Sequence, residues 1–310
     1  NGRIDLAEAE GLADLLAAET QSQRRAALAL AGGVLSRQIE AWQEKLLAIA
    51  ASVEAELDFD DEGDVQKSGK SQSNEALGPL IGELGAWLAR PPAERLRDGL
   101  RVVIAGPPNA GKSSLLNVLA GREAAITSAI AGTTRDLVEA PTAIGGAPFL
   151  LVDTAGLRIG GDAIEAIGVE RARASLAAAD LILWLGDPDG DPDPERTILV
   201  HPKSDRVAPD GRADVAVSAK TGAGIDALVA LMIERSRAML PGEGDVALNA
   251  RHRAVLSECL DWLREAASAR DPLIVAEALR QARAALDRIT GRAGVEDMLD
   301  ALFGRFCIGK

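Results

Sequence analysis

The chain has 310 residues, of which 47% are hydrophobic and 26% charged, and its formal net charge is -13. This length allows a sizeable core and more than one domain. The acidic balance argues against broad electrostatic attraction to nucleic acid, so any RNA contact must be local or carried by a partner.

The apolar runs of the sequence are far shorter than the roughly 20 residues of a membrane-spanning helix. The first residues, NGRIDLAEAEGLADLL, lack the basic start and apolar stretch of a secretory signal, and there is no initiating Met. We therefore expect a cytoplasmic protein without a membrane, truncated at its start. The two cysteines, Cys259 and Cys307, are too few for a disulfide framework or a metal cluster.

The first part of the chain has the pattern of helices. Apolar residues from Leu28 to Val53 recur at spacings of three and four, which predicts one face of a single long helix. A second pattern of this kind runs from Leu77 to Leu88. The acidic and then Ser-, Lys- and Gly-rich residues between them predict an exposed, mobile connection. Two prolines in RPPAERLRDG then end the helical pattern, and we place a domain boundary at Asp98.

The middle of the chain, residues 99–240, alternates short apolar runs with helical segments. The runs are RVVIAG, PFLLVDTAG, ADLILWLGD, RTILVHP and DVAVSAK. This alternation predicts a parallel-rich sheet with helices on both faces. Beyond residue 240 the helical spacing returns.

The predicted fold class is therefore α/β plus all-α. Residues 1–98 and 241–310 would form the two halves of one elongated helical-bundle domain, and the α/β domain of residues 99–240 would be inserted between them. Two separate helical domains would show the same pattern.

The segment GPPNAGKS, from Gly106 to Ser113, directly follows a predicted strand and opens a predicted helix. Its glycines let the backbone curl so that N–H groups and the positive end of the helix face phosphate oxygens. Lys112 would bridge the β- and γ-phosphates, and Ser113 would bind Mg²⁺. A chance glycine turn is the alternative. The motif predicts a P-loop that binds nucleotide through Asn109, Ala110, Gly111, Lys112, Ser113 and Ser114.

Two further segments fit a nucleotide switch. In DTAG, Asp153 can hold the magnesium shell through water, and the N–H of Gly156 can sense a γ-phosphate, with Thr154 and Ala155 between them. In AGTTRD, Thr134 can close over the second magnesium position when a γ-phosphate is present. Each segment alone could be an ordinary loop, but this order and spacing describe a switch nucleotidase.

The later segment PKSD, followed by VSAK, indicates which base is bound. Asp205 would accept from the N1–H and the N2 amino group of guanine, which adenine cannot supply, and Lys203 would lay its stem along the base. The backbone of Ser218, Ala219 and Lys220 would donate to the O6 oxygen. The pattern favours guanine over adenine.

Pro202 is a departure from this pattern, because the residue before the lysine is usually an asparagine whose amide contacts the base. Proline has no side-chain or backbone donor. The loss of one or two hydrogen bonds, at about 0.5 to 1.5 kcal/mol each, should weaken binding without reversing the preference for guanine. A base site that has decayed altogether is the alternative.

The residue after DTAG is Leu157, where many such nucleotidases carry a glutamine that orients the attacking water. An apolar side chain cannot polarise water, so another group must supply this role. One candidate is a potassium ion beside the phosphates. The other is Glu165, which from the residues alone is a solvated helix residue. The potassium ligands would be Asn109, Ser128, the Ile130 carbonyl and Thr133.

The segments NGRIDLAEAEGLADLL, GPPNAGKSSLLN, IAGTTRD, DTAGLR, IGVERA and the terminal FCIGK together resemble the MnmE (TrmE) tRNA-modification GTPases over the whole chain. The resemblance implies a potassium-stimulated GTPase that acts as a conformational switch, whose G domains pair across a homodimer when GTP is bound. It makes Glu165 the residue that orients water. It also implies a heterotetramer with the FAD-dependent partner MnmG. Together they would add an aminomethyl or carboxymethylaminomethyl group to C5 of the tRNA wobble uridine.

The resemblance further implies methylene-tetrahydrofolate as the one-carbon donor. Arg3 and Lys310 would hold the folate, and Cys307 would lie close to it in a catalytic role, with an inert terminal thiol as the alternative. Family members begin with a folate-binding, dimerising domain, which we expect to be missing from this chain, and the homodimer would form through that domain. Two rival functions are a nucleotide-dependent scaffold for MnmG and tRNA, and a ribosome-assembly GTPase, against which the acidic helical ends argue.

Overall fold

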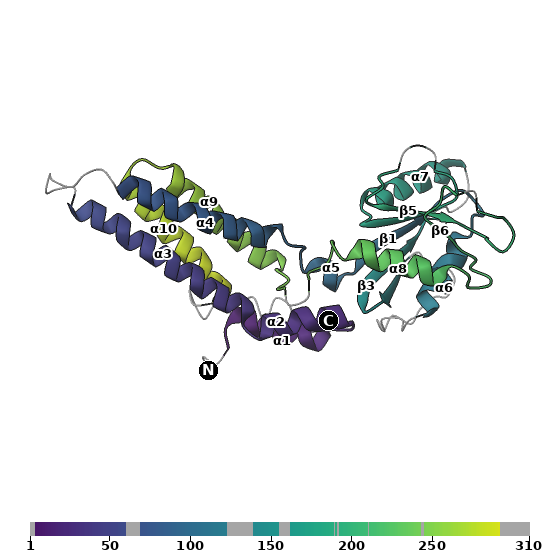
Figure 1. The fold of residues 1–310 in the computed structure, drawn as a ribbon, viewed down its shortest axis with the longest axis horizontal. Helices are drawn as coiled ribbons and strands as arrows, with labels where there is room; N and C mark the ends of the chain where they lie inside the picture. Colours follow the sequence, from purple (N-terminus) through teal and green to yellow (C-terminus); the bar gives the residue numbers. More distant parts are fainter. Residues whose placement is uncertain are drawn as a thin grey trace. The chain divides into compact units, whose positions relative to one another are not determined.

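The structure is a computed structural model that describes residues 4–59, 69–122, 139–154, 162–188, 190, 192–209, 211–242 and 245–291. It divides into two compact units, a helical one and an α/β one (Figure 1). The helical unit comprises Asn1–Ala18, Arg24–Ala93 and Glu243–Lys310. The α/β unit comprises Glu19–Gln23 and Glu94–Gly242. No helix among the described residues is long and apolar enough to cross a membrane.

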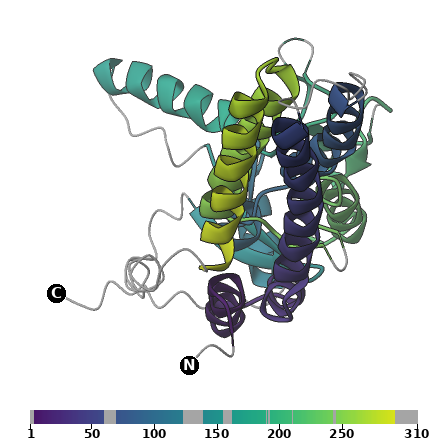
Figure 2. The same cartoon turned by 90° about the vertical axis from the view of Figure 1, so that its left-hand side faces the viewer.

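Most of the helical unit is a bundle of four helices with a common apolar core. In it α10 packs on α9 and α3, and α4 packs on α9 and α3, and Figure 2 shows α3 and α10 side by side. Trp42 is fully buried and meets Trp87 edge to face, with 5.4 Å between ring centroids. The bundle helices are α3 (Val34–Phe59), α4 (Gly69–Ala89), α9 (Ala250–Ser268) and α10 (Pro272–Thr290), and two shorter helices precede them, α1 (Leu6–Ala17) and α2 (Gln21–Ala31).

Side-chain caps fix where three of these helices begin. Asp5 and Glu8 form a capping box at the start of α1, in which each carboxylate accepts from the backbone N–H of the other residue. Asn249 and Asp271 accept from the first turns of α9 and α10 in the same way. The helix α10 ends at Gly291, which is left-handed with φ +73°.

The single long helix predicted from Leu28 to Val53 is wrong. Gly33 has φ +73° and separates α2 from α3, because a left-handed residue cannot continue a helix. Leu28 therefore belongs to α2 and is 49% exposed, whereas the other predicted positions of the face are buried on α3: Leu35, Ile39, Trp42, Leu46, Ile49 and Val53.

The exposed connection predicted before Leu77 is also partly wrong, because α4 already begins at Gly69. Packing of the buried Leu77, Leu80 and Leu84 stabilises this helix, and an apolar pattern cannot show how far a helix propagates beyond such contacts.

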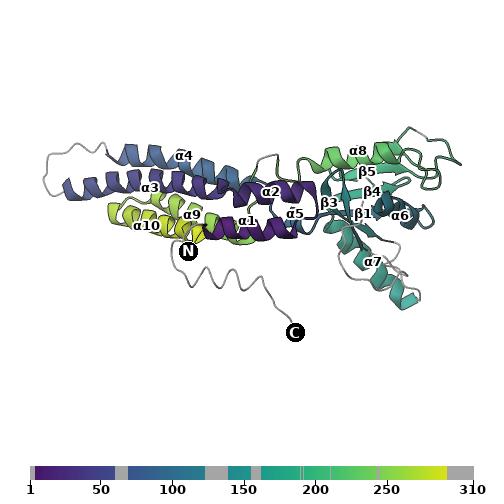
Figure 3. The same ribbon diagram turned by 90° about the horizontal axis from the view of Figure 1, so that it is seen from below.

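The α/β unit is built on a six-stranded sheet with the strand order β2-β3-β1-β4-β5-β6. All pairings are parallel except that of β2 with β3. Figure 3 shows α7 and α8 on opposite sides of the sheet, and α6 packs on β1, β2 and β3. The strands are β1 (Leu100–Ala105), β2 (Glu139–Ile144), β3 (Ala147–Asp153), β4 (Leu181–Leu185), β5 (Thr197–His201) and β6 (Val215–Ala216); the helices are α5 (Glu94–Arg97), α6 (Lys112–Arg122), α7 (Asp162–Ala177) and α8 (Ile225–Ser236).

The antiparallel strand β2 was not predicted from the sequence. It turns into β3 through Gly145 and Gly146, with φ +58° and +79°. Two glycines between alternating runs are a hairpin signal, so the strand could have been found from EAPTAIGGAPFLL. All five strands that the sequence predicted are present, as β1, β3, β4, β5 and β6. Their carboxyl ends meet at one edge of the sheet, on both sides of β1, which is where parallel α/β sheets bind ligands.

Candidate functional site

The loop between β1 and α6 has the backbone of a phosphate cradle. Gly106 has φ +134°, and a Cβ there would lie 2.4 Å from the carbonyl oxygen of Leu185 on β4, so only glycine fits. Gly111 has φ +104° and opens α6. Because the first N–H groups of a helix have no partner within it, the start of α6 presents donors and the positive end of its dipole to an anion.

Lys112 is 7% exposed and lies under this loop. Its ammonium donates to the carbonyl oxygens of Gly106 at 3.0 Å and Pro107 at 2.8 Å. These bonds compensate the buried charge and keep the side chain along the cradle. The ammonium is therefore positioned where phosphate oxygens would replace the two carbonyls.

The site also brings together an oxygen pair that suits magnesium. The Ser113 hydroxyl donates to the carboxylate of Asp153, which lies at the end of β3 and is 3% exposed. The register places Asp153 beside Ile104 on β1, whose carbonyl oxygen accepts from the Thr154 hydroxyl at 2.9 Å. A hydroxyl and one carboxylate match the few protein ligands that Mg²⁺ uses when phosphates supply others.

A cavity of about 300 Å³ lies between the P-loop and the loops after β5 and β6. This volume is at the lower end for small-molecule sites. Lys203 follows Pro202 here with a left-handed φ of +56°, and its ammonium donates to the carbonyl oxygen of Asn109 at 2.6 Å. The cavity is lined by Ala110, Gly111, Ser114, Leu115, Leu185, Pro202, Lys203, Asp205, Arg206, Val217, Ala219 and Lys220.

Asp205 is held in this cavity by the loop after β6. Its carboxylate accepts from the Ser218 hydroxyl at 2.7 Å. This hydrogen bond, against the opposing effect of burial and together with the charges of Arg206 and Lys220, lowers the pKa of Asp205. The main-chain N–H groups of Ala219 and Lys220 make no hydrogen bond within the described part of the protein. The loop thus offers an ionised acceptor next to free donors.

The structure brings most of the predicted nucleotide contacts together, and several others lie outside the described residues. Those brought together at the carboxyl edge of the sheet are Asn109, Ala110, Gly111, Lys112, Ser113, Ser114, Asp153, Thr154, Lys203, Asp205, Ser218, Ala219 and Lys220. Glu165 falls in α7, but its side chain is outside the described part. Also outside it are Arg3, Ser128, Ile130, Thr133, Thr134, Ala155, Gly156, Leu157, Cys307 and Lys310.

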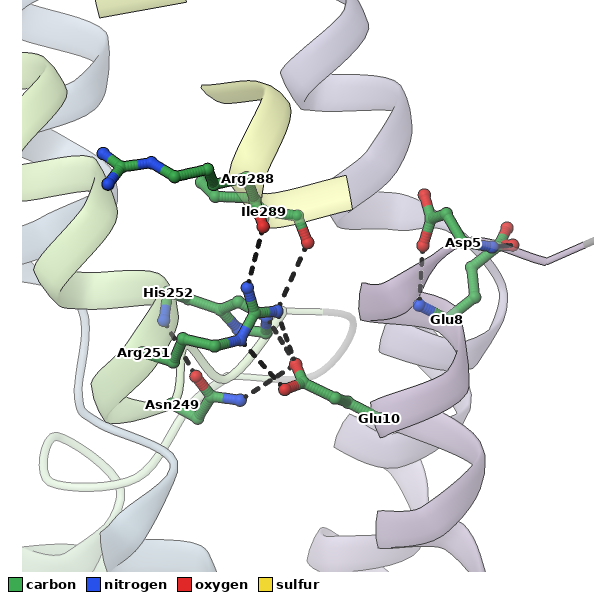
Figure 4. A network of polar contacts seen from close by, with 8 residues as sticks. All are labelled: Asp5, Glu8, Glu10, Asn249, Arg251, His252, Arg288 and Ile289. Carbon is green, nitrogen blue, oxygen red and sulfur yellow. Dashed lines mark hydrogen bonds and ion pairs between the residues drawn. The ribbon is translucent and has the colours of Figure 1, made fainter. Parts of the chain in front are cut away.

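Sequence reasoning missed a buried polar cluster in the helical unit, formed by Glu10, Asn249, Arg251 and His252 (Figure 4). The carboxylate of Glu10 on α1 accepts from Arg251 at 2.9 and 3.0 Å and from Asn249 at 3.2 Å, and it lies 2.8 Å from the His252 ring. Arg251 also donates to the last carbonyls of α10, including that of Ile289 at 3.2 Å. The cluster fastens α1 to the ends of α9 and α10. The sequence did offer one signal: Glu10 lies four positions after Leu6, and this spacing places the glutamate on the same face of α1 as the buried leucine.

Burial alone would raise the pKa of Glu10. The hydrogen bonds and charges of His252 and Arg251 outweigh it and lower this pKa to about 2. Glu10 is therefore an ionised carboxylate in a nearly water-free place, and its partners are required to keep it there.

The site has a phosphate cradle, the Ser113–Asp153 pair and the loop of Lys203 and Asp205, here called the K-x-D loop. At the carboxyl edge of a parallel sheet, these features define a P-loop domain of the GTPase class, inserted into a helical bundle. The family model of the MnmE helical domain matches residues 6–307 of the chain. The chain belongs to the MnmE family of tRNA modification GTPases, and the resemblance noted in the sequence is confirmed.

Curated relatives named tRNA modification GTPase MnmE match the chain over its full length. That of Rhizorhabdus wittichii is 59% identical over 311 residues, which is 100% of this chain and 70% of the relative. That of Erythrobacter litoralis is 56% identical and covered over 73% of its length. That of Sphingopyxis alaskensis is 54% identical over 323 residues and covered over 77% of its length.

Proposed function

We propose that the chain binds and hydrolyses GTP with Mg²⁺, and that this cycle is a conformational switch in tRNA wobble-uridine modification. The observation that carries the proposal is the cavity between the P-loop and the K-x-D loop, in which Ser218 orients the Asp205 carboxylate. A carboxylate beside free main-chain N–H groups complements the N1–H, N2 and O6 groups of guanine. A bound adenine would cover these groups without pairing them, so the cavity favours guanine.

The phosphates would lie on the first turn of α6. Lys112 would exchange the carbonyls of Gly106 and Pro107 for the β- and γ-phosphate oxygens. Ser113, with Thr134 in the GTP state, would hold Mg²⁺, and Asp153 would support its water shell. The metal would neutralise the charge that develops on the phosphates. The N–H of Gly156 would sense the γ-phosphate, and Thr154 and Ala155 would also contact the nucleotide.

The hydrolytic groups follow from family membership and from Leu157, which cannot polarise water. We assign Glu165 to orienting the attacking water. A potassium ion would be held by Asn109, Ser128, the Ile130 carbonyl and Thr133, in the place of an arginine finger. Asn109 has φ +60°, which is unusual for a side-chain-bearing residue and common at functional sites.

The names of the relatives support a role on tRNA. We propose that the chain acts in the cytoplasm with MnmG, in a heterotetramer, and that its G domains pair in a GTP-dependent homodimer. Methylene-tetrahydrofolate would be the carbon source, with Arg3 and Lys310 holding the folate and Cys307 beside it. GTP hydrolysis would drive the domain movement, not the chemistry on the uridine.

The test is a calorimetric titration of GDP against ADP with Mg²⁺ and potassium, followed by turnover of GTP in potassium and in sodium. GDP binding without an ADP signal, and faster turnover in potassium, are the expected results. A second candidate, a nucleotide-dependent scaffold with weakened guanine binding, is favoured by Pro202 in the base cavity. Loss of GDP binding, with no turnover in either salt, would support the scaffold instead.

A further inference from the structure

Pro202, the first residue after β5, is one of the residues that line the base cavity. Proline has no N–H and its ring carries only carbon and hydrogen toward a ligand. At this position the wall can therefore contact a base but cannot donate a hydrogen bond to it.

The neighbouring donors of this loop are already used within the protein. The backbone N–H of Ser204 donates to the carbonyl oxygen of Val217 at 3.0 Å. Those of Arg206 and Val207 donate to the Lys203 carbonyl at 2.8 and 3.1 Å. The Lys203 ammonium donates to Asn109 at 2.6 Å. If one of these groups donated to a base instead, the new hydrogen bond would gain no more free energy than the broken internal one loses.

The guanine groups that bear on this site are the N1–H and N2 amino donors and the O6 and N7 acceptors. Asp205 suits the first two, and the N–H groups of Ala219 and Lys220 suit O6. N7 lies on the other side of O6 from N1. The side chains of Arg206 and Ser114 in the cavity could also donate hydrogen bonds, but both are directed elsewhere. The guanidinium of Arg206 lies 3.9 Å from the Asp205 carboxylate. Ser114 lies in the first turn of α6, where the phosphates are expected. Among the described residues that line the cavity, no donor is then assigned to N7.

We propose that this site does not recognise N7 of guanine and accepts guanine nucleotides whose position 7 carries C–H in place of nitrogen. The inference rests on the proposed function of the site. An acceptor that the Pro202 ring covers and leaves unpaired costs free energy, whereas a C–H group against this ring does not. The 7-deazaguanine nucleotide is therefore bound as tightly as the natural one, or more tightly.

The experiment is a calorimetric titration of GDP and 7-deaza-GDP against the unaltered chain and against Pro202→Asn, with Mg²⁺ present. For the unaltered chain we expect the two dissociation constants to agree within about threefold, or 7-deaza-GDP to bind more tightly. In Pro202→Asn the new amide can donate to N7, so GDP should gain about fivefold or more over 7-deaza-GDP. Pro202→Ala, which has no side-chain donor, is the control and should keep the ratio of the unaltered chain.

The outcomes separate this inference from the proposed function. A preference of the unaltered chain for GDP of about tenfold would show that another donor contacts N7, and would overturn the inference alone. Binding of neither nucleotide would overturn the proposed function, and the inference with it. Equal binding of both nucleotides by Pro202→Asn would also contradict the inference, because position 202 would then not face N7.

Discussion

Among the described residues, Asn109 and Lys203 are the two non-glycine residues with positive φ, and they are hydrogen-bonded to each other. Each such conformation costs free energy that the surrounding structure must offset. Here the Lys203 ammonium lies 2.6 Å from the Asn109 carbonyl oxygen and so joins the base-binding loop to the P-loop. This hydrogen bond fixes the distance between the phosphate and base subsites. A nucleotide needs that fixed distance because it occupies both subsites at the same time.

Ser218 sets the charge and direction of Asp205, so we expect Ser218→Ala to weaken GDP binding by about tenfold. Without the hydroxyl, the pKa of Asp205 rises toward its ordinary value of 3.8, and the carboxylate protonates earlier as the pH falls. The defect should therefore grow in acid. Dissociation constants for GDP measured over a pH series check this.

The matched control for Ser218→Ala is Thr221→Ala, which removes an exposed hydroxyl from the same loop and leaves the Ser218–Asp205 bond in place. Its GDP affinity should equal that of the unaltered chain. A similar loss in both variants would mean that the loop, not the hydrogen bond to Asp205, determines affinity.

At the scale of elements, the attachment of α1 depends on the charge of Glu10. Its pKa is lowered from 4.5 to about 2, so its stabilising contribution is complete above pH 4.5 and is lost as the pH falls through about 2. At about 1.4 kcal/mol per pKa unit, the contribution is on the order of 3 kcal/mol. We expect Glu10→Gln to lower the free energy of unfolding near neutral pH and to remove this acid dependence.

Urea unfolding followed by circular dichroism, between neutral pH and pH 2, measures both effects of Glu10→Gln. Glu277→Gln is the control, because the pKa of Glu277 is also lowered to about 2, first by its hydrogen bond with Arg280, but on an exposed surface. Solvent screens this pair, so the control should leave stability unchanged. Equal losses in the two variants would contradict a special role for the buried cluster.

Close packing of α1 on α2 depends on Gly11, where a Cβ would lie 2.3 Å from the backbone nitrogen of Ala31. Gly11→Ala must push the two helices apart, at a cost of about 1 to 3 kcal/mol. Gly82→Ala places the same methyl in open space on α4 and should stabilise by up to about 1 kcal/mol, since alanine favours a helix. Thermal unfolding of both variants distinguishes packing from helix propensity, and a gain in both would refute the close contact.

The sequence predicted the elements whose pattern is local and missed the features set by distant contacts. The strands β1, β3, β4 and β5 are short apolar runs because both of their faces are covered, and such runs are visible in a sequence. The P-loop and the K-x-D loop were found from residue spacing. The bond of Lys203 to Asn109 joins residues 94 positions apart, and the partners of Glu10 lie about 240 positions away. No local pattern encodes such pairs.

At the scale of the molecule, the two units have separate apolar cores. A substitution in the Glu10 cluster should therefore change the stability of the helical unit without changing the affinity of the α/β unit for GDP. The charge, in contrast, belongs to the whole chain, and it bears on how the proposed tRNA partner would be bound.

With a net charge of -13, the chain as a whole repels a polyanion, and only a local basic patch could hold tRNA. Counterion release makes the salt dependence of binding proportional to the number of phosphates that the protein neutralises, so we expect a slope of log K against log salt no steeper than about 2. Fluorescence anisotropy of labelled tRNA, titrated at several salt concentrations with GDP and with a GTP analogue, measures it. Tight binding with a steep slope would show an extensive basic interface and contradict this expectation. A shallow dependence of log K on log salt would mean that this chain neutralises few tRNA phosphates, so that most phosphate contacts would be made by a partner protein.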